Sequence, residues 1–211
     1  MLLTVVDYGV GNLRSIAKSI EKANSDNNLK YSVKISSDIN DIKKSDKIVL
    51  PGQGSFKACK AGIDNIKGLQ AELNENVLVK KKPIYGICAG MQLFSTTGHE
   101  EETTEGLNWI PGEVIKLNLS STNLKIPHMG WNELKIKNAS KVFKDTNDGN
   151  HAYFIHSYEF IPEDKKVISL TSNYGKEVMA AVSLENIFGS QFHPEKSQNT
   201  GIQILTNFLN L

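Results

Sequence analysis

The sequence has few of the features that mark disulfide-rich, membrane-spanning or nucleic-acid-binding proteins. Its 211 residues include only two cysteines, Cys59 and Cys88, too few for a disulfide framework, which favours a reducing compartment. No apolar run approaches the ~18 residues that a transmembrane helix needs. The opening "MLLTVVDYG" lacks the basic stretch and the cleavage site of a signal peptide. Because the net charge is only +1, nothing indicates a nucleic-acid or membrane partner, and we expect a cytoplasmic protein.

In the first half of the chain, short apolar runs alternate with stretches in which apolar residues have helical spacing. The pattern predicts strands and helices in turn, with strands over 2–6, 31–35, 47–52 and 82–88 and helices over 13–23 and 56–80. This alternation is typical of βαβ units, in which helices cover both faces of a parallel sheet. The second half ends in an amphipathic helix, over 200–211. Before it we expect strands that extend the sheet in mixed or antiparallel fashion, over 112–117, 131–136, 152–160, 166–172, 178–184 and 187–192. We therefore expect one α/β domain over residues 1–211.

Three of the predicted strands end in loops rich in small residues: "DYGVGN", "PGQGSF" and "GICAGMQ". Ligands of open α/β sheets bind beyond the carboxyl ends of the strands. In "GICAG", Gly86 and Gly90 lie two residues on either side of Cys88, the spacing of a nucleophile elbow, where small residues relieve the crowding of a strained turn. A helix N-terminus would also favour a thiolate. The same pattern fits a plain turn around a buried thiol, so the elbow alone does not decide.

A thiol nucleophile needs a base, and His193 is the best-placed histidine. It follows a strand in "GSQFHPEKS", where Glu195 can orient the imidazole as the third member of a triad. An ordinary turn is the alternative. The glycines of "PGQGSF" can turn backbone N–H groups toward an oxyanion, or can simply make a turn. The other cysteine, Cys59, is expected to pack in a helix. The remaining histidines have simpler explanations in a polar run, a loop or a strand edge: His99, His128, His151 and His156.

Taken together, "GICAGMQ", "PGQGSF" and "QFHPEKS" resemble the motifs of class I, triad-type glutamine amidotransferases. "DYGVGN", "KIPHMGWN", "YFIHSY" and "FHPEKSQ" are similar to those of the glutaminase subunits of imidazole glycerol phosphate synthase, a histidine-biosynthesis enzyme. The resemblance runs from Val6 to Phe208. It implies an open mixed sheet with a mostly parallel core, flanked by helices. It also implies hydrolysis of glutamine to glutamate and ammonia, with no cofactor and no metal.

The resemblance also implies roles for individual residues. Cys88 would attack the glutamine amide to form a γ-glutamyl thioester, while His193 relays protons and Glu195 orients it. The backbone N–H groups of Gln53 and Ala89 would form the oxyanion hole. Further positions resemble the family's substrate pocket: Gly52, Gly54, Gln92, Glu100, Ser157 and Tyr158. Glu101 is an alternative to Glu100, because the register across "TTGHEEE" is not fixed by the sequence.

A partner is implied by the same resemblance. A (β/α)₈-barrel cyclase subunit would form a heterodimer with this chain, receive ammonia through a channel, and act as a lyase that converts PRFAR into imidazole glycerol phosphate and AICAR. Docking positions carried over are Asn12, Met129, Trp131 and Asn132, although Trp131 fits a core role equally well. We expect weak glutaminase activity until the cyclase and its nucleotide are bound, with the "PGQG" loop as the gate.

The sequence departs from the family at two positions. Gln53 stands where valine is common, and Ala89 stands where leucine or valine is common. Neither departure removes a member of the triad. Three alternatives stay open: a glutaminase that serves a different synthase, a stand-alone γ-glutamyl hydrolase, or a silent docking subunit. The presence of Cys88, His193 and Glu195 argues against the silent subunit.

Overall fold

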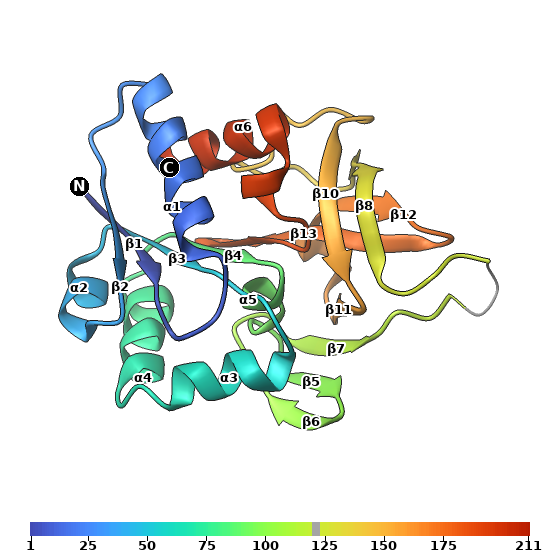
Figure 1. Cartoon of the computed structure of the whole chain (residues 1–211), viewed down its shortest axis with the longest axis horizontal. Coiled ribbons are helices and arrows are strands. Elements are labelled where there is room, and N and C mark those ends of the chain that lie inside the picture. Colours follow the sequence, from blue (N-terminus) through green and yellow to red (C-terminus); the bar gives the residue numbers. More distant parts are fainter. Residues whose placement is uncertain (120–122) are drawn as a thin grey trace.

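An eight-stranded sheet forms the centre of the molecule, with helices on both of its faces (Figure 1). The computed structural model describes residues 1–119 and 123–211. Five strands run parallel from one edge to the middle, in the spatial order β2 (Ser32–Ser36), β1 (Leu2–Val6), β3 (Lys47–Leu50), β4 (Ile84–Ile87) and β14 (Ile187–Ser190). Three antiparallel strands complete the sheet, β13 (Glu177–Leu184), β12 (Ile168–Asn173) and β9 (Lys135–Ile136). The expected mixed sheet with a mostly parallel core is confirmed.

Two smaller sheets lie beside the central one. The first pairs β8 (His128–Glu133) with β10 (His151–His156) in antiparallel register. The second has four strands, in the order β11 (Tyr158–Pro162), β7 (Gly112–Lys116), β5 (Thr97–Glu100) and β6 (Glu102–Glu105). The two sheets join at Ser157, which separates β10 from β11 and lines the cavity described below.

The helices divide between the two faces of the central sheet (Figure 1). One face carries α1 (Leu13–Asp26) and α6 (Gln198–Leu209), which contact each other. The other carries α2 (Ile39–Lys44), α3 (Phe56–Asp64) and α4 (Leu69–Asn74), which continues as a π-helical turn over Glu75–Val79. Short helical turns complete the chain: α5 (Ala89–Gln92), η2 (Lys165–Val167) and η3 (Pro194–Lys196).

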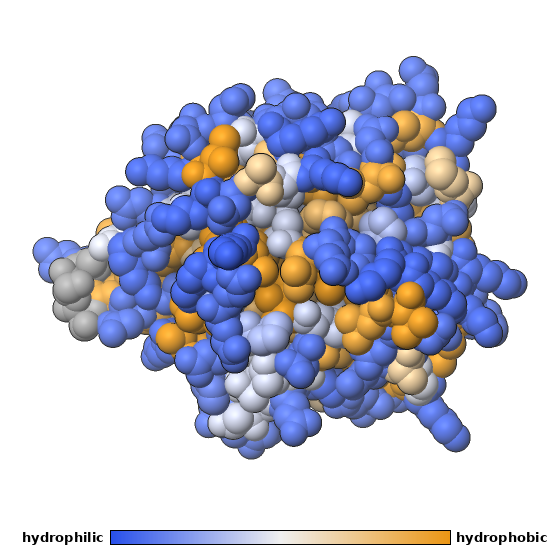
Figure 2. All heavy atoms as spheres, turned by 180° about the vertical axis from the view of Figure 1, so that it is seen from behind, coloured by the Kyte–Doolittle hydropathy of each residue, from blue (hydrophilic) through white to orange (hydrophobic). Residues whose placement is uncertain are grey.

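Each face of the sheet has its own apolar core, because alternate strand residues point to opposite sides. Leu3 and Val5 pack with α1 and α6, whereas Ile48 and Leu50 pack with the helices of the other face. β3 and β4 are buried at every residue, as central strands covered on both faces must be. Hydrophilic side chains cover most of the surface seen in Figure 2, and apolar atoms appear between them near its middle.

The sequence prediction was wrong about the second half in one respect. Of the strands in this half, β9, β12, β13 and β14 join the central sheet, whereas β7, β8, β10 and β11 belong to the smaller sheets. Alternating apolar residues indicate a strand but do not specify its neighbours. The predicted strand 152–160 is two strands, broken at Ser157. Apart from single helical turns, three elements were not predicted: α2, β5 and β6. The α2 helix is short and polar, and the β5–β6 hairpin is mostly polar and exposed.

Candidate active site

Cys88 sits on a sharp turn between β4 and α5, at the carboxyl edge of the central sheet. Its backbone angles are φ 53° and ψ −116°, a region that costs a residue with a side chain on the order of 1–3 kcal/mol. A Cβ on Gly86 would lie 2.6 Å from Met91 Cα, and one on Gly90 would lie 2.2 Å from Leu50 O. Both contacts are impossible, so the two glycines relieve the crowding of this elbow as predicted.

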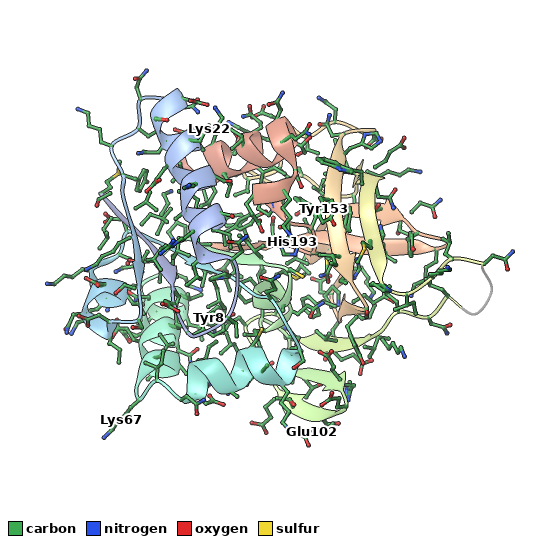
Figure 3. All side chains as sticks on the ribbon, in the orientation of Figure 1. Tyr8, Lys22, Lys67, Glu102, Tyr153 and His193 are labelled. Atoms are coloured by element: carbon green, nitrogen blue, oxygen red, sulfur yellow. The ribbon has the colours of Figure 1, made fainter. Side chains whose placement is uncertain are left out.

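His193 and Glu195 form a buried pair beside this turn. His193 Nδ1 lies 2.8 Å from Glu195 Oε1, and the side chains are 6% and 1% exposed. The His193 backbone is held from both sides, since its N–H donates to Tyr153 O at 2.9 Å and its carbonyl accepts from Ser197 Oγ at 2.6 Å. Figure 3 shows His193 near the middle of the molecule, close to Tyr153 of β10. The spacing across Pro194 therefore places the carboxylate behind the imidazole.

The surroundings of His193 favour its protonated form. Burial opposes the charge, but hydrogen bonds and charge interactions with Cys88 and Glu195 outweigh it and raise the pKa of His193 to about 10. The imidazolium form is therefore favoured, with the sulfur on one side of the ring and a carboxylate on the other. Such a cation can both stabilise a thiolate and supply a proton.

A cavity of about 290 Å³ opens over Cys88 and His193. It brings together most of the predicted substrate and oxyanion positions, namely Gln53, Gly54, Ala89, Gln92, Glu100, Ser157 and Tyr158. Pro127, Met129 and Ile155 add an apolar wall. Within the described part of the chain, no group of three or more His, Cys, Asp or Glu side chains has the arrangement of a metal site.

Gly52, another predicted substrate position, does not line the cavity and packs directly against the elbow. A Cβ at this position would come within 1.8 Å of Gly90 N. The Tyr8 hydroxyl donates to the carbonyl of Pro51 and ties the start of this loop to the loop after β1. Gln53 and Gly54 are exposed beyond it. The close contact at Gly52 thus brings the backbone of the "PGQG" loop against the turn that carries Ala89.

Comparison with known proteins agrees with this geometry. The family described as "Glutamine amidotransferase class-I" matches residues 4–211. Imidazole glycerol phosphate synthase subunit HisH of Pelagibacter ubique (strain HTCC1062) is 48% identical over 211 residues, which span all of both chains. The HisH subunit of Brucella suis biovar 1 (strain 1330) is 41% identical, covering 99% of this chain and 98% of its own. The chain belongs to the HisH family of class I glutamine amidotransferases.

Solved structures share the fold at low sequence identity. A glutamine amidotransferase has a TM-score of 0.72 at 14% identity, with 99% of both chains covered. Another glutamine amidotransferase, from Thermotoga maritima, has a TM-score of 0.65 at 17% identity, covering 95% of this chain and 78% of its own. The HisH assignment therefore rests on the sequence relatives, and the structures support the fold.

The structure distinguishes the two acidic residues that were candidates for the substrate pocket of this HisH family member. Glu100 lines the cavity at the end of β5, and its Oε2 accepts the Phe56 N–H at 2.7 Å. Glu101 is an exposed turn residue between β5 and β6 with φ 63°. Glu100 is therefore the carboxylate that faces the cavity, and the hydrogen bond holds it there.

Gln92 also lines the cavity, with its amide nitrogen already used. Nε2 donates to Tyr158 O at 3.0 Å and to Gln191 Oε1 at 2.9 Å. A carboxamide has two N–H hydrogens, so the group that Gln92 retains for a ligand is its oxygen. An acceptor of this kind suits an ammonium or an amide N–H.

His128 and His156 differ from the sequence expectation, because both are buried, at 2% and 6% exposure. Asn132 Nδ2 lies 3.1 Å from His128 Nε2, His128 Nδ1 lies 3.0 Å from His156 Nε2, and His156 Nδ1 lies 2.9 Å from Tyr158 O. Because Asn132 Nδ2 can only donate and the Tyr158 carbonyl can only accept, both rings are neutral and their tautomers are fixed. Burial lowers the pKa of His128 to about 4 and that of His156 to about 3.

The predicted docking residues lie on or near the surface. Met129 and Trp131 of β8 are 58% and 48% exposed, so Trp131 is not a core residue. Asn12 is exposed and caps α1 through a 3.4 Å bond from Ser15 N. Met129 also lines the cavity, so the exposed face of β8 borders the candidate active site. Cys59 is fully buried in α3, as predicted.

One residue that the sequence interpretation missed is Gln191, whose Nε2 lies 3.5 Å from Cys88 Sγ. Its side chain is fully buried. The available signal was a carboxamide near the end of the predicted strand 187–192, two residues before His193.

Proposed function

We propose that this chain is the glutaminase component of an imidazole glycerol phosphate synthase and hydrolyses L-glutamine to glutamate and ammonia. The observation that carries the proposal is the buried His193, placed between a thiol on a strained turn and a carboxylate. The HisH relatives support it, since they match the whole chain. We propose further that residues 1–211 act as one domain, and that the protein works in the cytoplasm.

The reaction would begin at the sulfur. The Cys88 thiolate attacks the side-chain carbonyl carbon of glutamine, and the oxyanion that forms is held by the N–H groups of Gln53 and Ala89. His193 as imidazolium gives its proton to the amide nitrogen, the C–N bond breaks, and ammonia leaves with a γ-glutamyl thioester remaining. Neutral His193 then takes a proton from water, which attacks the thioester. The C–S bond breaks, glutamate leaves, and the thiolate–imidazolium pair is restored.

The pocket walls would orient the substrate for this attack. Glu100 is a carboxylate suited to the substrate ammonium, and the Gln92 oxygen is an acceptor on the same wall. Ser157 and Tyr158 would complete the enclosure. Gly54 would allow the substrate close to the backbone, and Gly52 would allow the loop close to the elbow. Because the rings of His128 and His156 are neutral, they would leave the imidazolium of His193 as the positive charge beside the sulfur.

We propose that the ammonia passes to a barrel-shaped cyclase partner that makes imidazole glycerol phosphate and AICAR from PRFAR. Ammonia is largely protonated at cytosolic pH and is then a poor nucleophile, so a sealed transfer has a chemical reason. Met129, Trp131, Asn132 and Asn12 are the docking positions that we propose, with Met129 at the rim of the cavity supporting this choice.

The "PGQG" loop would gate the reaction. A peptide flip that removes one oxyanion donor costs about 2.7–4 kcal/mol of transition-state stabilisation, or 10²–10³ in rate. We therefore expect weak glutaminase activity from this chain alone, with a strong rise when both cyclase and nucleotide are bound. The test is co-purification with the cyclase, followed by glutaminase assays with and without the nucleotide. Equal activity in all states would contradict the gating, and failure to bind the cyclase would favour a different synthase.

A further inference from the structure

Gln191 is a fully buried carboxamide beside the nucleophile. It follows β14 directly, and its backbone N–H donates to Ala180 O at 2.8 Å, which fixes where the side chain begins. The side-chain nitrogen, Nε2 of Gln191, lies 3.5 Å from Cys88 Sγ. The side chain thus contacts the sulfur from the strand next to β4, while His193 approaches it from the segment that follows.

The orientation of this amide follows from its neighbours. The carbonyl of Tyr158 can only accept a hydrogen bond, so Gln92 must present its NH₂ group to it. The same NH₂ group then faces Gln191, which must present its oxygen, at 2.9 Å. The nitrogen of Gln191 is therefore directed at the sulfur. Flipping either amide would set like groups against each other within this buried chain.

We infer that Gln191 is a positioning residue whose amide N–H hydrogen-bonds the Cys88 thiolate. The inference rests on the proposed role of Cys88 as nucleophile. A donor aimed at sulfur favours the charged form over the thiol. It also restrains the sulfur at one fixed point, so that attack on the substrate carbon starts from one geometry.

The same contacts connect substrate binding to the nucleophile. Gln92 lines the cavity and holds the Gln191 oxygen, and Gln191 in turn holds the sulfur. A ligand that fixes Gln92 therefore also restrains the donor to Cys88. A purely structural Gln191 would differ, since it would only supply an acceptor to Gln92.

Two substitutions separate these roles in the full-length chain. Gln191→Glu keeps an oxygen for the Gln92 N–H, has no N–H for the sulfur and places a negative charge beside it. Gln191→Met keeps the length and removes both groups. The readout is the pH dependence of Cys88 alkylation by iodoacetamide, followed by mass spectrometry of the labelled peptide. Cys59 is the internal control, because burial raises its pKa to about 11 and exposure of it would report unfolding.

We expect both variants to move the alkylation profile of Cys88 to higher pH by about one unit, which is a ~10-fold loss of labelling rate on the acid limb of the wild-type profile. Gln191→Glu is expected to shift at least as far as Gln191→Met. A Gln191→Met profile that coincides with the wild-type profile would overturn the inference, because Met removes the donor to the sulfur without adding a charge beside it.

A further comparison does not depend on the folding of Gln191→Glu. Gln92→Met removes the support of Gln191 but leaves its N–H, so it should raise KM while shifting the profile less than Gln191→Met. Equal shifts would overturn the inference. The proposed function is tested separately, since a Cys88→Ala variant that still hydrolyses glutamine would contradict it whatever the titration shows.

Discussion

Replacing Glu195 by Gln tests how the buried pair supports the reaction. The change keeps the size and the hydrogen-bonding oxygen of the side chain but removes its negative charge. His193 Nδ1 and Glu195 Oε1 are 2.8 Å apart and both side chains are almost fully buried. Water therefore screens this pair little, and the carboxylate is one of the two groups that raise the pKa of His193.

The expected loss follows from the charge interaction. Two unit charges about 4 Å apart attract by about 4 kcal/mol at an effective dielectric constant near 20. Part of this attraction survives as a hydrogen bond to the Gln oxygen. We therefore expect Glu195→Gln to lower kcat/KM for glutamine by about 10²–10³, since each 1.4 kcal/mol is a factor of ten.

The assay is glutamine hydrolysis with the cyclase and its nucleotide present, measured across pH. The pKa of His193 should fall in the variant, so the alkaline limb that requires imidazolium should move to lower pH. Glu177→Gln is the matched control, because Glu177 pairs with Lys137 at 2.9 Å on the exposed surface, where such a pair contributes little. A loss of less than tenfold in Glu195→Gln, or an equal loss in the control, would refute the reasoning.

Three further predictions concern stability and docking. Gly52→Ala should destabilise the fold by about 3 kcal/mol or more in urea unfolding, since the new Cβ would lie 1.8 Å from Gly90 N. The control Gly9→Ala has open space around it and should cost only about 1–2 kcal/mol. Equal costs for the two variants would contradict the packing argument. Lowering pH from 7.5 to 5.5 should cost about 1.4 kcal/mol of unfolding free energy for each of His128 and His156, because the unfolded chain binds protons near pH 6.5 and the folded rings, with pKa values of about 4 and about 3, do not. His156→Gln should lower that cost by about 1.4 kcal/mol, while His193, whose raised pKa acts in the opposite sense, contributes equally in both proteins. An unchanged slope would show that the ring of His156 is not held neutral. Trp131→Ala should weaken cyclase binding at least tenfold in a titration with unchanged melting temperature, and unchanged affinity would exclude Trp131 from the interface.

The sequence predicted the parallel half of the fold well, for a physical reason. Strands such as β3 and β4 are short apolar runs between helices. An uninterrupted apolar run of this length indicates both that the segment is a strand and that it is buried on both faces. The smaller sheets were harder, because pairing partners depend on contacts far along the chain. The β5–β6 hairpin is polar and exposed, so its sequence carried no apolar alternation.

The same distinction holds for the candidate site. Local spacing located Cys88 between its two glycines and His193 next to Glu195. Spacing could not show that Gln191 contacts the sulfur, since its amide is oriented by Gln92 and by a carbonyl of β11. Nor could it show that His128 and His156 are buried, because their environment comes from aromatic neighbours, with His128 stacked against Phe154 and Tyr174.

The central claim is that Cys88 releases ammonia for use by a partner protein. The most direct measurement compares synthesis from glutamine with synthesis from an ammonium salt, using Cys88→Ala bound to the cyclase. We predict that the variant loses glutamine-dependent synthesis and keeps ammonium-dependent synthesis at the wild-type rate. Glutamine-dependent synthesis that survives the substitution would contradict the account.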